Sequence, residues 1–569
     1  MNLLDRAELL AHILRWRLTW DRRNTAYLPS EALAEKFKSA RAAADMIPDA
    51  ACVISCGIAG NARCSIHYWA VRERFEETGY PKGLTWISVG GQGGRSRIPG
   101  TVEEVGLDGL VTRYITGHTE TAKSLLRLAD AKRLELHTLP QCEMTHIIEA
   151  QSRGEESVRS HTGVGSFLDT RVGRGSPVTP DATSQFAQSD GDEIVYTLPA
   201  IDVALMSASY ADRDGNIYFH NAATITENIE AARAARKNGG LVIVSVSALI
   251  ERDETSIGLH SDEVDTVVIN PRNEQTGSVA QNRHWKMFTA GANVDEREAV
   301  ERIRFINKTL GVTPRRGPIE HALARLGAKT FVKNVAAGST VNIGVGLAEE
   351  VCCVLCENPT REQITFTTES GPYGGIPTPG IFFGAAINPQ RLESSAWMFH
   401  HYRDHLDAAM LGFLQLDSAG NINLSNRGPR MLDYVGPGGA PSIIESARTV
   451  MFIGKWMLGA EVSIHGGELR LDKPGKHKVV ERVDEVTFNG RVGLARGKKI
   501  FYVTDLAVLE LTEAGLTLRA VMPGIDIERD LLANTKARII VPDDPAPVRV
   551  SASVVTGKNF QLNWAENSL

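Results

Sequence analysis

The sequence predicts an α/β protein built from two similar, open α/β domains that derive from a duplicated half, with the active site between them. The chain has 569 residues, of which 43% are hydrophobic and 23% charged, so it can form a sizeable core and wholesale disorder is excluded. Short apolar runs are repeatedly followed by a glycine-rich turn and a helical stretch, as at residues 52–75 and 339–358. This alternation is typical of α/β architecture. An internal repeat then indicates that the unit occurs twice.

The repeat pairs residues 202–219 with residues 407–424 at a constant offset of 205. The identical positions fall in the order strand, Gly-Asn turn and second strand, which favours duplication over chance. They are Asp202, Ala204, Asp212, Gly215, Asn216 and Ile217 in the first copy and Asp407, Ala409, Asp417, Gly420, Asn421 and Ile422 in the second. The first turn begins like a calcium-binding loop, but its spacing is wrong and no Glu closes it. We therefore expect a β-turn with glycine in the left-handed conformation.

The repeat and the charged helical stretch between its copies predict four segments. They are a helical N-terminal extension at 1–35, a first domain at 36–285, a linker at 286–317 and a second domain at 318–569. In residues 1–23, leucine and isoleucine recur at helical spacing, so we expect this helix to pack on the body of the protein or on a second subunit.

Charge and cysteine content limit the partners and the compartment. The formal net charge is −6, so no overall basic field favours nucleic acid or a membrane surface. Seven cysteines at irregular spacing do not make a disulfide framework and indicate a reducing compartment, the cytoplasm. Asp5 and Glu8 exclude a signal or transit peptide, and the absence of an 18-residue apolar run predicts no membrane span.

A glycine turn and a glutamate in the second domain are also compatible with a dinucleotide-binding site. Gly344 and Gly346 follow the strand-like TVNI and open a helix, as in a dinucleotide-binding fingerprint, and Glu369 ends the next strand, where such folds place a ribose-binding acid. Glu349, however, occupies the position of the third glycine. A loop rich in glycine and proline follows Glu369 in place of a helix, and such a loop lets a bulky ligand come close. A plain, solvated surface glutamate is the competing structural interpretation.

A third glycine cluster, Gly-Pro-Gly-Gly-Ala at 436–440, runs into a predicted helix with Pro441 in its first turn. Backbone N–H groups at such a helix start can stabilise an oxyanion, although a plain tight turn explains the cluster equally well. The Cys353-x-x-Cys356 pair lacks a second pair or nearby histidines, so we expect no metal site. The sequence has neither a Walker A string nor a Gly-x-Ser-x-Gly elbow.

Taken together, these segments resemble the family I CoA-transferases nearly from end to end. The segment around Glu369, TTESGPYGGIPTPGIFFGAA, is similar to the catalytic-glutamate segment of that family. The β-half signatures are resembled by VNIGVGLAEEV, LDAAMLGFLQLDSAGNINLS and GPGGAPSIIESARTVMFIG, and the α-half by LPQCEMTHIIEAQSRG, HTGVGSFLDTRVGRGSP and IDVALMSASYADRDGNI. The whole looks like the fused, single-chain acetate or propionate CoA-transferase type. The two predicted domains then correspond to the α-type half and to the β-type half with the catalytic glutamate.

The resemblance implies roles for individual residues. Glu369 is the essential glutamate, and Gly438 and Gly439 are the glycines of the oxyanion loop. The residues expected to contact CoA are Gly344, Gly346, Gly436, Ala440 and Gln141. The chain departs from the family pattern where Cys142 follows Gln141 in place of glycine, where CGIAGNAR replaces an SGFGG-like string, and at Ala440, where phenylalanine is frequent. These departures bear on the substrate class.

The implied chemistry is ping-pong transfer of CoA through a covalent glutamyl-CoA thioester. A free glutamate carboxylate is ionised at neutral pH and attacks without a general base, and neighbouring amides stabilise the tetrahedral oxyanions. We expect no permanently bound cofactor, CoA as substrate, an acyl-CoA and a small carboxylic acid such as a short-chain fatty acid as partners, and a homo-oligomer. The alternatives are an acyl-CoA thioester hydrolase on the same scaffold and a nucleotide-binding oxidoreductase that uses Gly344 and Glu369.

Overall fold

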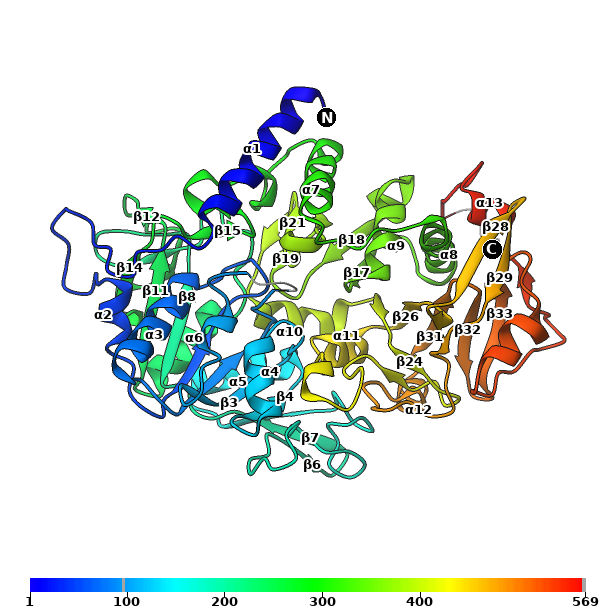
Figure 1. The fold of residues 1–569 in the computed structure, drawn as a ribbon, viewed down its shortest axis with the longest axis horizontal. Helices are drawn as coiled ribbons and strands as arrows, with labels where there is room; N and C mark the ends of the chain where they lie inside the picture. The colour runs from blue at the N-terminus through cyan, green and yellow to red at the C-terminus, as the bar shows by residue number, and fades with distance from the viewer. Residues whose placement is uncertain (95–97, 565–569) are drawn as a thin grey trace.

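Two open sheets form the framework of the chain (Figure 1). The structure is a computed structural model that describes residues 1–94 and 98–564. The first sheet is parallel throughout, in the order β14-β11-β8-β1-β2-β3-β4. Its strands are β1 (Cys52–Ser55), β2 (Leu84–Ser88), β3 (Val111–Thr116), β4 (Glu135–Thr138), β8 (Val203–Ser207), β11 (Leu241–Val246) and β14 (Thr266–Ile269).

Helices cover both faces of this sheet, which explains why its strands are apolar along most of their length. Along β1, Cys52 and Ile54 belong to one buried hydrophobic cluster and Val53 to another, so the sheet has a core on each side. The helices of this half are α2 (Ala40–Ala44), α3 (Ser65–Thr78), α4 (Lys123–Asp130), α5 (Gln141–Arg153) and α6 (Asn228–Lys237).

The second sheet has ten strands in the order β22-β19-β18-β17-β23-β26-β31-β32-β33-β34. The strands from β18 to β31 are parallel. At one edge β19 and β22 pair antiparallel, and at the other β32 and β33 pair antiparallel before β34, which is parallel to β33. The strands are β17 (Ser339–Ile343), β18 (Ile364–Thr367), β19 (Pro372–Tyr373), β22 (Arg391–Leu392), β23 (Ala408–Gly412), β26 (Thr449–Gly454), β31 (Lys499–Thr504), β32 (Ala507–Thr512), β33 (Gly515–Val521) and β34 (Val548–Arg549). The helices are α8 (Pro318–Asn334), α9 (Leu347–Cys356), α10 (Ser395–His405), α11 (Ala440–Ser446), α12 (Gly490–Ala495) and α13 (Ala552–Thr556).

Short strands complete the fold in small sheets and hairpins. They are β5 (Ser157–Ser160), β6 (Ala187–Asp190), β7 (Glu193–Thr197), β9 (Tyr210–Ala211), β10 (Ile217–Tyr218), β12 (Ala248–Leu249), β13 (Ile257–Leu259), β15 (Glu274–Thr276), β16 (Val279–Ala280), β20 (Ile376–Pro377), β21 (Ala386–Ile387), β24 (Gln415–Leu416), β25 (Ile422–Asn423), β27 (Met457–Leu458), β28 (Glu461–His465), β29 (Glu468–Lys473) and β30 (Lys476–His477).

The predicted duplication is confirmed by the order of the strands. The series β14-β11-β8-β1-β2 in the first sheet corresponds to β31-β26-β23-β17-β18 in the second. Strands β8 and β23 begin and end 205 residues apart, and so do the hairpins β9–β10 and β24–β25. The repeat therefore marks the same structural unit in each sheet.

The identical residues of the repeat make the same contacts in both copies. Asp202 Oδ2 accepts a hydrogen bond from Cys52 N at 2.7 Å, and Asp407 Oδ2 accepts one from Thr340 N at 2.9 Å. Each aspartate thus ties the start of its own strand to the neighbouring parallel strand. A buried backbone N–H needs such a partner, which explains why the acid recurs at this position.

The two Asp turns are β-turns, as predicted. Asp212 Oδ1 accepts from Asn216 N, and Asp417 Oδ1 accepts from Asn421 N, both at 3.0 Å. The glycine of each turn has a positive φ, +90° at Gly215 and +76° at Gly420, which a side chain would disfavour. The carboxylates hold backbone amides, so the turns need no calcium ion to explain the acids.

Two helices lie on one side of the molecule, above the junction of the sheets (Figure 1). The predicted N-terminal helix is present as α1 (Leu3–Thr19), and it packs on α7 (Glu296–Leu310) through Leu9 and Ile13, which are buried. The segment limits at residues 35, 285 and 317 stay predictions. No helix in the described ranges is long and apolar enough to cross a membrane.

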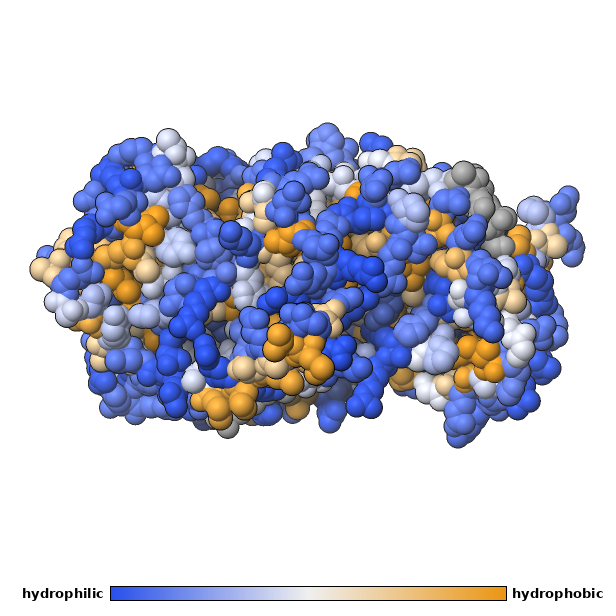
Figure 2. Space-filling model, turned by 90° about the horizontal axis from the view of Figure 1, so that it is seen from above, coloured by the Kyte–Doolittle hydropathy of each residue, from blue (hydrophilic) through white to orange (hydrophobic). Residues whose placement is uncertain are grey.

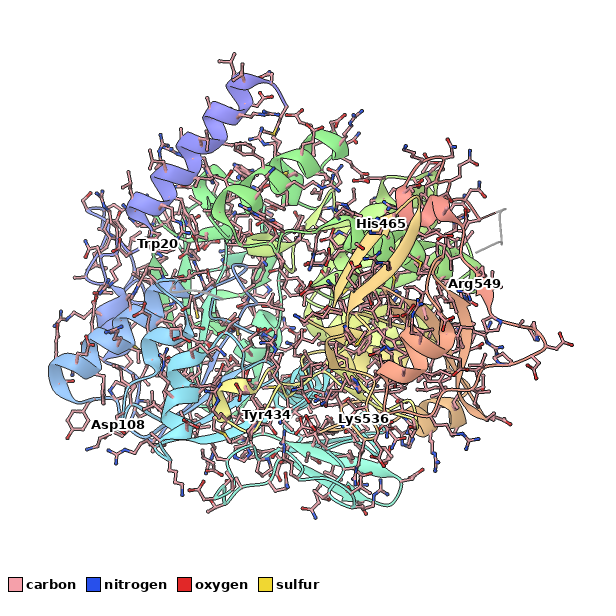
Figure 3. The ribbon with its side chains drawn as sticks, turned by 45° about the vertical axis from the view of Figure 1, so that its right-hand side comes forward. Trp20, Asp108, Tyr434, His465, Lys536 and Arg549 are labelled. Carbon is pink, nitrogen blue, oxygen red and sulfur yellow. The ribbon has the colours of Figure 1, made fainter. Side chains whose placement is uncertain are left out.

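The two halves are joined by direct contacts around their junction. Tyr434, labelled in Figure 3, belongs to the second half by sequence, yet it packs in a hydrophobic cluster of the first half. Its hydroxyl donates to Glu485 Oε2 at 2.9 Å, and the same carboxylate forms an ion pair with Arg174 of the first half at 3.2 Å. Asn61 Nδ2 donates to the Phe383 carbonyl at 2.6 Å. These bonds fix the two sheets relative to each other.

Candidate active site

Glu369 lies at the carboxyl end of β18, in the turn that reverses the chain into β19. Position 371 requires glycine, because its φ is +131° and a Cβ atom would lie 2.4 Å from the Glu393 carbonyl oxygen. The hydroxyls of Thr368 and Ser370 both donate to the Gly384 carbonyl. The turn that presents Glu369 is therefore held on both sides of this residue.

The carboxylate of Glu369 has a buried amide as partner. Asn342, in β17, donates from Nδ2 to Glu369 Oε2 at 3.1 Å and lies 3.2 Å from the Tyr402 hydroxyl. Burial, and then the negative charge of Glu369, raise the pKa of Tyr402. Glu369 itself is half-buried, so its carboxylate is oriented by Asn342 and still reaches the cavity in front of it.

The loop at 436–440 packs against a turn of the other half. Gly438 N–H donates to the Gly117 carbonyl at 2.7 Å, and Gln141 N–H donates to the Gly438 carbonyl at 3.0 Å. Gly436 has a φ of +83°, and a Cβ atom there would lie 2.6 Å from the Gly117 oxygen. Close approach of two backbones thus explains this glycine. Because the Gly438 N–H already donates to the Gly117 carbonyl, it cannot donate to an oxyanion in this conformation. Of the two glycines predicted to stabilise the oxyanion, Gly439 is therefore the remaining candidate.

Gly439 faces both Glu369 and Gln141. A Cβ atom built on Gly439 would lie 3.4 Å from Gln141 Oε1 and 3.8 Å from Glu369 Cγ. Gln141 is the first residue of α5 in the first half, whereas Gly439 and Glu369 belong to the second. The structure therefore brings together three predicted site residues from the two halves.

All eight predicted site residues line one cavity of about 510 Å³. They are Glu369, Gly438, Gly439, Gly344, Gly346, Gly436, Ala440 and Gln141. Gly344 and Gly346 lie between β17 and α9, as the fingerprint-like spacing predicts. The walls come from the carboxyl ends of strands in both sheets, where ligands bind in open α/β folds. The cavity lies between the two halves, as predicted.

Two residues of the site were missed by the sequence reasoning as individual positions. Asn342 is the asparagine of the VNIGVG segment, of which only the glycines were predicted as site residues. Tyr402 lies in the WMFHHYRDH helix, and no local pattern distinguishes it from an ordinary core tyrosine.

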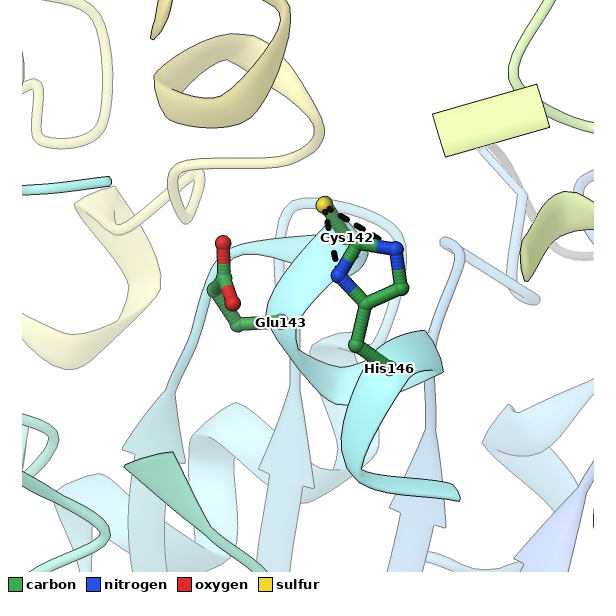
Figure 4. A group of neighbouring side chains, drawn as sticks. All are labelled: Cys142, Glu143 and His146. Atoms are coloured by element: carbon green, nitrogen blue, oxygen red, sulfur yellow. Dashed lines mark hydrogen bonds between the residues drawn. The ribbon is translucent and has the colours of Figure 1, made fainter. Parts of the chain in front are cut away.

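Cys142, Glu143 and His146 form a cluster of polar side chains on α5, the helix that begins at Gln141 (Figure 4). Cys142 Sγ lies 3.4 Å from His146 Nδ1, and ligand atoms of Cys142, Glu143 and His146 lie within 4.8 Å of one another. Arg403 Nη2, however, lies 3.0 Å from the same His146 nitrogen, and Ser160 donates to Glu143 at 3.0 Å. Burial lowers the pKa of His146 to about 3, so the ring is neutral and accepts from Arg403. A guanidinium there disfavours a metal cation, and hydrogen bonds explain the cluster.

Comparison with known proteins gives consistent results. A sequence profile of the family described as "Coenzyme A transferase" matches residues 102–264. The chain is 31% identical to caffeate CoA-transferase of Acetobacterium woodii, over 87% of this chain and 93% of that protein. It is 27% identical to acetate CoA-transferase YdiF of Escherichia coli K12, over 87% of this chain and 90% of the relative. The crystal structure of the YdiF apoenzyme from Escherichia coli O157:H7 superposes with a TM-score of 0.79 at 23% identity, covering 92% of this chain and 97% of that one.

These similarities extend over both sheets, so they confirm the expected fold and the single-chain arrangement of the two halves. They favour neither the hydrolase nor the nucleotide-binding oxidoreductase. The chain belongs to the CoA-transferase family.

Proposed function

We propose that this CoA-transferase moves CoA from an acyl-CoA to a small carboxylic acid through a covalent glutamyl-CoA thioester on Glu369. The observation that carries the proposal is the position of the Glu369 carboxylate in one cavity with Gln141 and Gly439. A carboxylate is an anionic nucleophile that needs no general base.

The proposed reaction proceeds through two carbonyl centres. A Glu369 carboxylate oxygen attacks the thioester carbonyl of the acyl-CoA, and the CoA thiolate leaves, which gives an acyl-glutamyl anhydride. The thiolate then attacks the glutamyl carbonyl and releases the first acid, which leaves the glutamyl-CoA thioester. An acceptor carboxylate attacks this thioester and repeats the two steps in reverse. Protons and charge balance without a further reactant.

Residues next to Glu369 orient its carboxylate, stabilise the oxyanion and contact CoA. Asn342 orients the Glu369 carboxylate by its 3.1 Å hydrogen bond. Gly439 and the side chain of Gln141 lie beside Glu369. We assign the Gly439 N–H to the oxyanion, because preorganised donors contribute most there. Gly438 fixes the loop through Gly117 and Gln141. For CoA itself we propose contacts along Gly344, Gly346, Gly436 and Ala440 of the same cavity.

Kinetics of Glu369 variants test the proposal. Glu369→Gln keeps the shape but not the nucleophile, so turnover should fall by many orders of magnitude while CoA still binds. Glu369→Asp should misplace the oxygen by about 1 Å and lower the rate roughly 100-fold. Initial rates should be ping-pong, and consumption of the acyl-CoA should depend on added acetate. Intersecting lines, near-native turnover of Glu369→Gln, or repeated turnover of acyl-CoA without acetate, beyond one equivalent per active site, would contradict the proposal.

Two further properties belong to the proposal. The side of the molecule that carries α1 shows hydrophobic side chains in separate patches amid polar surface (Figure 2), and the leucines of α1 that face away from α7 are exposed. These exposed hydrophobic side chains support a homo-oligomer, which light scattering tests.

The seven cysteines are all unpaired, which supports a location in the cytoplasm.

A further inference from the structure

A second cavity, of about 630 Å³, lies next to the catalytic cavity and between helices α7 and α9. Its inner wall is apolar. Val300 and Ile303 from α7, Cys352 and Cys353 from α9, and Ile376 and Phe383 from the loop after Glu369 contribute to it. We call this space the α7–α9 cavity.

The two cavities meet beside the nucleophile. Ile343, Glu349 and Phe383 line both of them. Thr368 lines the α7–α9 cavity, whereas the next residue, Glu369, lines the catalytic one. The α7–α9 cavity therefore adjoins the catalytic cavity at these shared side chains, next to the position of a carbonyl bound at Glu369.

Two ion pairs, together with Arg297, Glu301 and Glu349, lie around the α7–α9 cavity. Arg304 forms an ion pair with Glu357 at 2.5 Å, and Glu296 forms one with Arg361 at 3.1 Å. Burial raises the pKa of Cys353 to about 11 although the Arg304 guanidinium lies beside it, so this thiol is neutral. The cavity thus favours an apolar occupant over the phosphates of CoA.

Size indicates which part of the substrate fits. A volume of about 630 Å³ lies in the range of pockets that bury drug-sized ligands, and an acetyl group would leave most of it empty. Resting on the function proposed above, we propose that the α7–α9 cavity receives the acyl group of the donor, and that the protein prefers thioesters with a bulky, apolar acyl group. The thiols and Phe383 suit an aromatic ring, because sulfur and ring edges make favourable contacts.

Filling the cavity tests the inference. Val300 is only half-buried, so Val300→Trp should fold while its indole enters the cavity; Cys353→Phe fills it from the opposite wall. With propionate as acceptor, so that transfer from either thioester gives a new product, the ratio of kcat/KM for cinnamoyl-CoA to that for acetyl-CoA should fall roughly 10- to 100-fold in both variants. Val172→Trp, at a site 72% exposed in the first half, is the matched control and should leave the ratio unchanged.

Each other outcome overturns the inference. An unchanged ratio in both filled variants means that the acyl group does not enter this cavity. An equal loss for the two thioesters means that the cavity holds a part common to them, such as the pantetheine arm. If the wild-type protein transfers from acetyl-CoA but not from cinnamoyl-CoA, only this inference fails. If it forms no Glu369 adduct with either thioester, the proposed function itself fails.

Discussion

Substitution of Gly439 by alanine tests the active-site geometry directly, because alanine can adopt the backbone conformation of this residue but its methyl group would enter the active site. The residue has φ −80° and ψ −7°, which alanine adopts freely. The added methyl group would lie 3.2 Å from Ile443 Cδ1, 3.4 Å from Gln141 Oε1 and 3.8 Å from Glu369 Cγ. No contact is below 3.0 Å, so the fold should tolerate the change. The methyl group would nevertheless occupy the space between Glu369 and Gln141, where the reacting carbonyl must come within about 3.5 Å of the nucleophile.

We therefore expect Gly439→Ala to lower kcat/KM roughly 100-fold with little change in thermal stability. Gly438→Ala is the matched control. Gly438 has φ +59° and no atom within 4 Å of a built Cβ, so alanine should cost about 1–2 kcal/mol of stability from backbone strain and affect turnover less. Initial-rate kinetics and thermal melts of the two variants measure both effects. Near-native turnover in Gly439→Ala, or a larger kinetic loss in Gly438→Ala, would show that the reacting carbonyl does not lie between Glu369 and Gln141.

Two other predictions concern stability and assembly. Burial raises the pKa of Glu227, which accepts from Gly57 N–H at 3.1 Å, from 4.5 to about 8. The folded state therefore holds a proton that the unfolded state has lost. The free energy of unfolding should fall by about 1.4 kcal/mol per pH unit as pH rises between these values. Glu227→Gln should remove that slope, so parallel profiles of Tm against pH for the wild type and the variant would contradict the prediction. Separately, chains divided within residues 311–317 should be active only when mixed, because Gln141 lies in one part and Glu369 in the other. Activity of the second part alone would be the contrary result.

Much of the framework was accessible from the sequence because local patterns carry it. Asp202 and Asp407 recur because each must satisfy an amide of the neighbouring strand, and the turn glycines recur because of their positive φ. The 205-residue offset therefore predicted the matching strands of both sheets. Glu369 was identified by the glycine-rich loop that follows it.

Contacts between distant segments could not be predicted in the same way. The engagement of the Gly438 amide depends on Gly117, which is more than 300 residues away in the chain. Tyr402 reaches Asn342 from a separate helix, and Arg403 similarly approaches His146. The α7–α9 cavity arises because α7, which was predicted as part of a charged helical linker, lies beside α9 of the second half. Such pairings depend on the tertiary arrangement and leave no periodic signal.

The central claim is that Glu369 carries CoA between the two half-reactions. Intact-protein mass spectrometry after addition of an acyl-CoA without acceptor measures this directly. We expect a mass increase of one CoA per active site that maps to the peptide bearing Glu369, disappears on addition of acetate, and is absent in Glu369→Gln. Turnover in the acetate-dependent assay with no CoA adduct on that peptide would contradict it.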